Sequence, residues 1–242
     1  MIKISAVNYL NTKPFVHGIQ HSGYLEDFEL QLDIPSVCAT KVINHEVDIG
    51  LVPIAILPEL AYKEILTDYC IGAKGAVGSV LLLSEEPLDK IENIILDFHS
   101  NTSISLVKVL CSKYWNINPS WINSTKDFDH LIKGTTAGLL IGDRSMKIRS
   151  QFDFVYDLAF EWEQFSKMPF VFACWVCNRK LPEQFVSNFE KAISWGVANK
   201  LASIAGVENY QEAKDYVENN ISYDLDAAKK SAMKLFLSYL RG

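Results

Sequence analysis

The sequence predicts an α/β protein with two lobes, in which a first β/α unit is interrupted by a second and is then completed by C-terminal helices. Three observations predict this plan. Strand-like and helix-like patterns alternate through about the first 85 residues, the alternation restarts near Pro87, and helical patterns end the chain. Each lobe should hold a mixed β-sheet flanked by helices. Because domain interfaces favour small-molecule sites, a ligand is expected in the cleft between the lobes.

In the first lobe, strands are predicted where apolar side chains alternate with polar ones or form short continuous runs. These strands are residues 2–7, 28–34, 48–52 and 75–84. The last of them is a longer buried strand that is entered through glycines. Proline marks the start of two helices, because the fixed φ of Pro14 and of Pro35 suits a first helical position. A further helix is expected to begin at Ile54.

The second lobe is expected to begin near Pro87, with a helix over residues 104–114. Its predicted strands are residues 94–97, 137–143 and 154–158. The chain then returns through an apolar strand over residues 170–177. It ends in helices at about 183–199, 210–219 and 225–240, the last with an apolar stripe formed by Ala228, Ala232, Leu235 and Leu240. The predicted first lobe comprises residues 1–86 and 168–242, and the second comprises residues 87–167.

The composition is that of an ordinary globular protein, with 49% hydrophobic and 21% charged residues. No apolar run reaches the roughly 20 residues of a membrane span, and the N-terminus lacks the pattern of a signal peptide. A cytoplasmic protein without a membrane partner is therefore expected. The net charge is −6 and no segment gathers Lys and Arg with aromatic residues, so nucleic acid is not an expected partner. The oligomeric state is left open.

Cysteine and histidine provide little evidence for a metal or redox centre. Of the five cysteines, only Cys174 and Cys177 have the spacing of such a motif. Positions three apart in a strand point to opposite faces, so these thiols are expected in the core. The histidines are scattered, and only His99, beside a hydroxyl-rich turn, is a candidate for contact with a ligand. No P-loop, dinucleotide fingerprint or Ser-His-Asp arrangement is present, and neither a metal nor another cofactor is expected.

Four polar segments follow predicted strands or begin helices, and they could converge on one cleft, because ligands of open α/β sheets bind at the carboxyl ends of strands. Their candidate residues are Asn8, Asn11 and Thr12; Gly78 and Ser79; Ser100, Thr102 and Ser103; and Asp143. The turn at residues 100–103 combines hydroxyls with unpaired N–H groups at a helix start, which favours binding of an anion such as a carboxylate.

Each segment also has an ordinary structural interpretation. Residues 8–12 can be a simple strand-to-helix turn. Ser100 or Thr102 can cap the helix that follows, and Asp143 can do the same for the next helix. The glycines Gly75 and Gly78 can mark a bulge in a strand.

Several motifs occur in order over most of the chain. They include residues 9–14 (YLNTKP), 47–53 (VDIGLVP), 75–80 (GAVGSV), 96–103 (LDFHSNTS) and 139–143 (LLIGD). Together they resemble the chorismate dehydratase family of the futalosine route to menaquinone. This resemblance implies a type II periplasmic-binding-protein-like fold, and it implies a carbon–oxygen lyase that removes water from chorismate to give 3-[(1-carboxyvinyl)oxy]benzoate without metal or organic cofactor.

The resemblance matches Asn11 and Ser79 to the family's active-site Asn and Ser. We assign these two residues to holding the leaving hydroxyl and the enolpyruvyl side chain, and the other candidates to binding the substrate. Asp143 is the one obvious protein base, but the hypothesis favoured here is that the enolpyruvyl carboxylate of the substrate removes the ring proton. The alternatives are a non-catalytic small-anion-binding protein and the sister naphthoate-forming enzyme of the same route.

Overall fold

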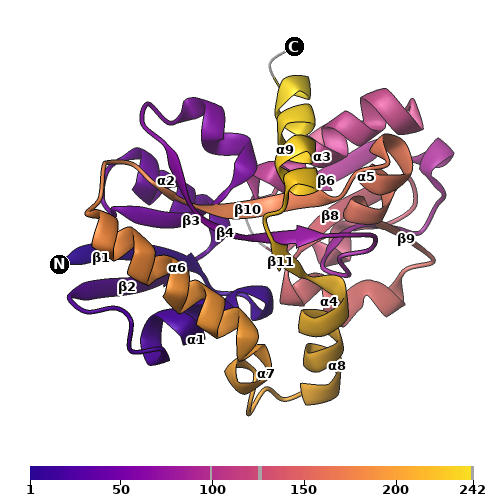
Figure 1. Ribbon diagram of the computed structural model, residues 1–242. Coiled ribbons are helices and arrows are strands. Elements are labelled where there is room, and N and C mark those ends of the chain that lie inside the picture. Colours follow the sequence, from indigo (N-terminus) through magenta and orange to yellow (C-terminus); the bar gives the residue numbers. More distant parts are fainter. Residues whose placement is uncertain (99, 125–126, 241–242) are drawn as a thin grey trace.

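Two mixed β-sheets with helices packed against them form the protein (Figure 1). The computed structural model describes residues 1–98, 100–124 and 127–240. Within them, sheet A has six strands in the order β11-β4-β10-β3-β1-β2, and sheet B has five in the order β7-β6-β8-β5-β9. The predicted α/β fold with two mixed sheets is confirmed, because each sheet contains both parallel and antiparallel pairs.

The strands of the two sheets come from different parts of the chain. The strands of sheet A are β1 (Ile2–Val7), β2 (Phe28–Asp33), β3 (Ile49–Pro53), β4 (Glu64–Ala73), β10 (Phe170–Cys177) and β11 (Ser222–Asp224). The strands of sheet B are β5 (Val80–Ser84), β6 (Asn93–Leu96), β7 (Ser120–Asn123), β8 (Thr136–Ile141) and β9 (Phe154–Asp157). The central strands β3 and β5 are buried along their whole length, which explains why their sequences are continuous apolar runs.

The helices begin where the sequence offers a suitable first residue. The helices are α1 (Lys13–His21), α2 (Pro35–Ile43), α3 (Asn101–Leu110), α4 (Asp143–Ile148), α5 (Leu158–Ser166), α6 (Glu183–Ala198), α7 (Lys200–Ser203), α8 (Tyr210–Asp215) and α9 (Ala227–Tyr239). Proline lies in the first turn of α1 and of α2, as predicted. The side chains of Ser100, Asp157 and Asp226 accept backbone N–H groups at the starts of α3, α5 and α9.

The chain crosses between the sheets at a different place from the one predicted. The segment 80–84 was expected in the first lobe, but β5 pairs with β8 and β9 and therefore belongs to sheet B. The first connection is residues 74–79, where Gly75 and Gly78 have φ of +79° and +76°, so these glycines lie in a loop rather than in a strand bulge. An apolar run that is buried on both faces fits the centre of either sheet. The periodicity of residues 80–84 therefore did not reveal which strands would pair with β5.

Other differences concern sheet A and the last helix. Strands β4 and β11 were not predicted, nor was the edge strand β7 of sheet B. Strand β4 has irregular register with β10 and β11, which breaks its alternation. In α9 the buried face is formed by Lys229, Ala232, Met233 and Phe236, whereas Ala228 of the predicted stripe is exposed. The Lys229 side chain is fully buried because its Nζ donates to the Asp224 carbonyl oxygen at 2.6 Å.

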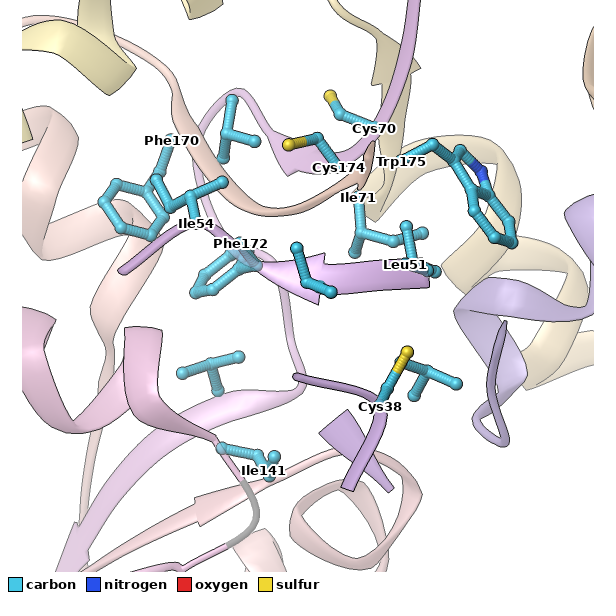
Figure 2. Close-up of a cluster of buried hydrophobic side chains, with 14 of the residues drawn as sticks. Cys38, Leu51, Ile54, Cys70, Ile71, Ile141, Phe170, Phe172, Cys174 and Trp175 are labelled. Carbon is cyan, nitrogen blue, oxygen red and sulfur yellow. The ribbon is translucent and has the colours of Figure 1, made fainter. Parts of the chain in front are cut away.

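The largest apolar cluster lies around β10, which runs through the middle of sheet A (Figures 1 and 2). Figure 2 shows Cys174 of β10 next to Cys70 of β4, its partner across the two strands. All five cysteines are buried and free, so the prediction that Cys174 and Cys177 belong to the core is confirmed. None of the helices that the structure describes is both long and apolar enough to span a bilayer.

Candidate active site

A hollow of about 500 Å³ lies between the two sheets. Its apolar wall includes Leu51, Ile71 and Phe172 from sheet A and Ile141 from sheet B, and Figure 2 shows Ile141 on the opposite side from the other three. Its polar lining comes from Tyr9, Asn11, Thr12, Ser79, Ser100 and Ser103. Residues from three of the four predicted segments therefore meet in one cavity.

The segments meet there because of strand direction. The loop with Asn11 follows the carboxyl end of β1, and the turn with Ser100 follows β6. Ser79 precedes β5, which runs antiparallel to β8, so the start of β5 lies beside the carboxyl end of β8, with Val80 opposite Ile141. The polar residues thus gather at facing edges of the two sheets, as expected for ligand sites of α/β proteins.

Asn11 and Ser79 are joined through a third residue, Tyr216. The Asn11 amide Nδ2 donates to the Tyr216 hydroxyl oxygen at 3.2 Å, and the hydroxyls of Tyr216 and Ser79 are 2.7 Å apart. The Thr12 hydroxyl donates to Asn11 Oδ1 at 3.1 Å, and the Tyr223 hydroxyl donates to the Asn11 carbonyl oxygen at 3.0 Å. All five side chains are buried. The two predicted catalytic residues therefore belong to one hydrogen-bonded network.

The start of α3 forms another polar part of the lining. The Ser100 Oγ accepts the Ser103 backbone N–H at 3.3 Å and the Ser103 hydroxyl at 3.1 Å, so Ser100 both caps the helix and faces the cavity. Thr102 does not line the cavity. Its Oγ1 instead accepts the N–H of Ala55 at 3.1 Å, at the start of a short 3-10 helix that follows β3. Its hydroxyl therefore joins the two lobes, and its predicted contact with substrate is not supported by this position.

The loop before Ser79 is held by the carboxylate of Asp157. Its oxygens accept the N–H groups of Val77 at 3.1 Å and of Gly78 at 2.6 Å, and those of Ala159 and Phe160 in the first turn of α5. Burial raises the pKa of Asp157 above its usual value, and these backbone donors oppose the rise. Gly78 itself does not line the cavity, so its contribution is the turn rather than contact with a ligand.

Replacing Asp157 by Asn is expected to lower the free energy of unfolding by about 1–3 kcal/mol, because the amide has one acceptor oxygen and would face a backbone donor with its NH₂ group. Urea denaturation measures this change. The exposed Asp153, directly before β9, provides a control, since Asp153→Asn should have almost no effect. Equal losses for the two variants would show that Asp157 does not stabilise the loop.

Asp143 lies outside the main cavity, in a neighbouring hollow that also contains Lys13 and Lys147. It is the first residue of α4 rather than its cap, and its Oδ1 accepts the N–H of Leu10 at 3.2 Å. Burial raises its pKa, while the Leu10 N–H and the two lysines oppose the rise. The carboxylate therefore connects the helix after β8 to the loop after β1.

Two further candidates can be placed briefly. Asn8 is exposed and does not line the cavity, because the chain turns after Val7 so that Tyr9 and Asn11 face inward. His99 lies outside the described residues. Among the described residues, no group of three or more His, Cys, Asp or Glu side chains could hold a metal ion.

Comparison with known sequences decides the family. Residues 2–242 match the sequence profile of the family described as "Menaquinone biosynthesis". The protein belongs to this family. A chorismate dehydratase from Thermus thermophilus is 27% identical over 192 residues, which cover 72% of this chain and 69% of that protein.

Solved structures confirm the fold expected for this menaquinone biosynthesis family member. Protein AF1704 from Archaeoglobus fulgidus has a TM-score of 0.76 at 13% identity, with 99% of this chain and 96% of that chain covered. The Candida albicans CA3427 gene product, described as having the generic periplasmic binding protein fold, has a TM-score of 0.63 at 13% identity, covering 98% and 90%. The alkanesulfonate-binding protein SsuA from Xanthomonas axonopodis pv. citri has a TM-score of 0.64 at 13% identity, covering 99% and 92%.

In this family member, the cavity is nearly free of side chains that ionise near neutral pH. Among the described residues, no carboxylate, imidazole or amine lines it. Tyr9 is the one titratable lining residue, and its pKa is raised by burial and by the carboxylates of Asp97 and Asp143. Its hydroxyl therefore stays protonated and can serve as a hydrogen-bond donor.

Sequence reasoning missed Tyr216, Tyr223 and Asp157 as parts of the site. The two tyrosines follow Asn11 by more than 200 residues in the sequence. No local pattern distinguishes them from aromatic residues of the core. Asp157 offered one signal, since an acidic residue directly before a helix is a typical N-cap.

Proposed function

We propose that this protein is a chorismate dehydratase, a carbon–oxygen lyase that eliminates water from chorismate to give 3-[(1-carboxyvinyl)oxy]benzoate, and that it works in the cytoplasm. The observation that supports this most directly is the cavity that brings Asn11 and Ser79 together among hydroxyls and apolar side chains. These two residues match the active-site Asn and Ser of the chorismate dehydratases that the chain resembles. Membership of the menaquinone biosynthesis family and the dehydratase relative support the same reaction.

Neutral donors are the proposed ligands of the two substrate carboxylates. The start of α3 offers backbone N–H groups, and the Ser100 hydroxyl lies beside them with its hydrogen available, since Ser100 Oγ accepts from Ser103. The apolar wall formed by Leu51, Ile141 and Phe172 is suited to the ring. Because the side chains of Ser100 and Ser103 are buried, hydrogen bonds made there are stronger than they would be in solution.

The proposed chemistry uses the substrate as its own base. The ring hydrogen that is lost is conjugated to the ring carboxylate and its loss makes the ring aromatic, so the enzyme has to orient the substrate more than to supply a strong catalyst. The enolpyruvyl carboxylate takes this proton, the two electrons of the C–H bond form the new ring double bond, and the ring C–O bond breaks. The carboxylic acid that has formed passes the proton to the leaving hydroxyl, which departs as water and restores the carboxylate. Asn11 and Ser79 hold the leaving hydroxyl and the enolpyruvyl side chain in the reactive arrangement.

Incubation of the purified, metal-stripped protein with chorismate tests the reaction. Chromatography with mass detection should show chorismate replaced by an aromatic product that is lighter by one water. Bound chorismate that is recovered unchanged would indicate a small-anion-binding protein instead. A folded protein that neither binds nor converts chorismate would point to the sister naphthoate-forming activity.

Replacing Asp143 by Asn should reduce kcat for chorismate by less than about tenfold, because Asn can still accept the N–H of Leu10 and the carboxylate lies outside the cavity. Loss of a general base typically costs about 10²- to 10⁴-fold. Steady-state kinetics measures the difference. An Asp143→Asn variant that binds ligand but does not turn over would identify Asp143 as the base.

A further inference from the structure

The hydroxyl of Tyr216 is buried between the two proposed catalytic residues. Tyr216 begins a π-helical turn, Tyr216–Asn220, that follows α8, and its side chain is only 2% exposed. Its oxygen is 2.7 Å from Ser79 Oγ and 3.2 Å from Asn11 Nδ2. Tyr216 is not among the residues that line the cavity, so it would act on a bound substrate only through Asn11 and Ser79.

The direction of the hydrogen bonds follows from the donors available. Thr12 donates to Asn11 Oδ1, which leaves Asn11 Nδ2 to donate to the Tyr216 oxygen. Either hydroxyl could donate across the 2.7 Å between Tyr216 and Ser79. We take Tyr216 as the donor, because its phenol has a single hydrogen and Ser79 Oγ is its one hydrogen-bond acceptor among the described residues. The hydrogen of Ser79 is then not needed by Tyr216 and is free to point into the cavity that Ser79 lines.

The C-terminal segment that contains Tyr216 also holds both partners in place. Tyr223 donates to the Asn11 carbonyl oxygen at 3.0 Å. Asn220 Nδ2 donates to the carbonyl oxygen of Ala76 at 3.1 Å, in the loop that leads to Ser79. The segment 216–223 therefore contacts the Asn11 backbone, the Asn11 side chain and the Ser79 loop.

We propose that Tyr216 is a positioning residue that orients the Ser79 hydroxyl as a hydrogen-bond donor toward an oxygen of the bound substrate and fixes the Asn11 amide beside it. The proposal rests on the proposed function, in that the oxygen belongs to the leaving hydroxyl or to the enolpyruvyl carboxylate. Without the phenol hydrogen, Ser79 can rotate and its hydrogen is no longer directed into the cavity. The Asn11 amide also loses its acceptor.

The test compares Tyr216→Phe, Ser79→Ala and the double variant in steady-state kinetics with chorismate. Tyr216→Phe keeps the ring and should lower kcat about 10- to 100-fold, with KM changed by less than about threefold, because the lost interaction orients groups rather than binds substrate. In the Ser79→Ala background the same change should cost less than about threefold, since Tyr216 acts mainly through Ser79. Wild-type kcat in Tyr216→Phe, or full multiplication of the two losses, would overturn the proposal.

Tyr69→Phe is the matched control, because the Tyr69 hydroxyl donates to Ser194 Oγ at 3.0 Å on the α6 side of sheet A and does not touch the cavity. Its kcat should equal that of the unmodified protein. A crystal structure of Tyr216→Phe tests the positioning without turnover, since Ser79 or Asn11 should leave its present rotamer. Two unmoved side chains would overturn the positioning role, whereas failure of the wild-type protein to convert chorismate would overturn the proposed function alone.

Discussion

Replacing Asn11 by alanine is expected to lower kcat for chorismate dehydration by about 100- to 1,000-fold, the range seen when one oriented donor is removed from a preorganised site. The Asn11 side chain is held by Thr12 and Tyr216, and its carbonyl oxygen by Tyr223, so its position is set before substrate binds. In the proposed mechanism, removal of the amide takes away a preorganised donor to the substrate. Ser79→Ala should have an effect of similar size for the same reason.

Steady-state kinetics measures these losses, and binding of chorismate by calorimetry separates them from a failure to bind. Asn44→Ala provides the control, because Asn44 is exposed, does not line the cavity and donates to Glu46, so this variant should leave kcat unchanged. An Asn11→Ala variant with more than half of the normal kcat would remove Asn11 from the proposed mechanism.

Adding a single methyl group at Gly18 is expected to cost about 3 kcal/mol or more of the free energy of unfolding. A Cβ at Gly18 of α1 would lie 2.1 Å from the carbonyl oxygen of Ala192 in α6, and a Cβ at Gly196 would lie 2.1 Å from that of Pro14. Both obstacles are backbone atoms, which cannot move aside as a side chain can, so the two helices would have to separate. Because α1 begins directly after Thr12, separation would also displace Asn11.

Urea denaturation of Gly18→Ala measures the loss. Gly134→Ala is the matched control: its φ is +52°, and no atom lies within 4 Å of an added Cβ. It should cost only about 1–2 kcal/mol, the strain of a left-handed backbone. If the two variants lose the same stability, the close contact between α1 and α6 is not the reason that residue 18 requires glycine.

Much of the local structure and part of the site could be predicted from the sequence. Proline in the first turn identified the starts of α1 and α2, and the polar residues after β1 and β6 identified segments that line the cavity. These predictions succeeded because the groups involved interact with residues a few positions away. A free N–H at a helix start, a fixed φ and the alternation of a strand are local properties of the chain.

Other features were decided by contacts between distant segments. The bond from Asn11 to Tyr216 spans 205 residues and the one from Ser79 to Tyr216 spans 137. The place of β5 in sheet B, the burial of Lys229 in α9 and the links that Thr102 and Asp143 form between the lobes depend on which elements meet. Composition and periodicity indicate that a side chain is buried or polar, but its partner is known only once the two sheets have packed. The tertiary structure alone therefore decided which hydroxyls face the cavity and which hold the lobes together.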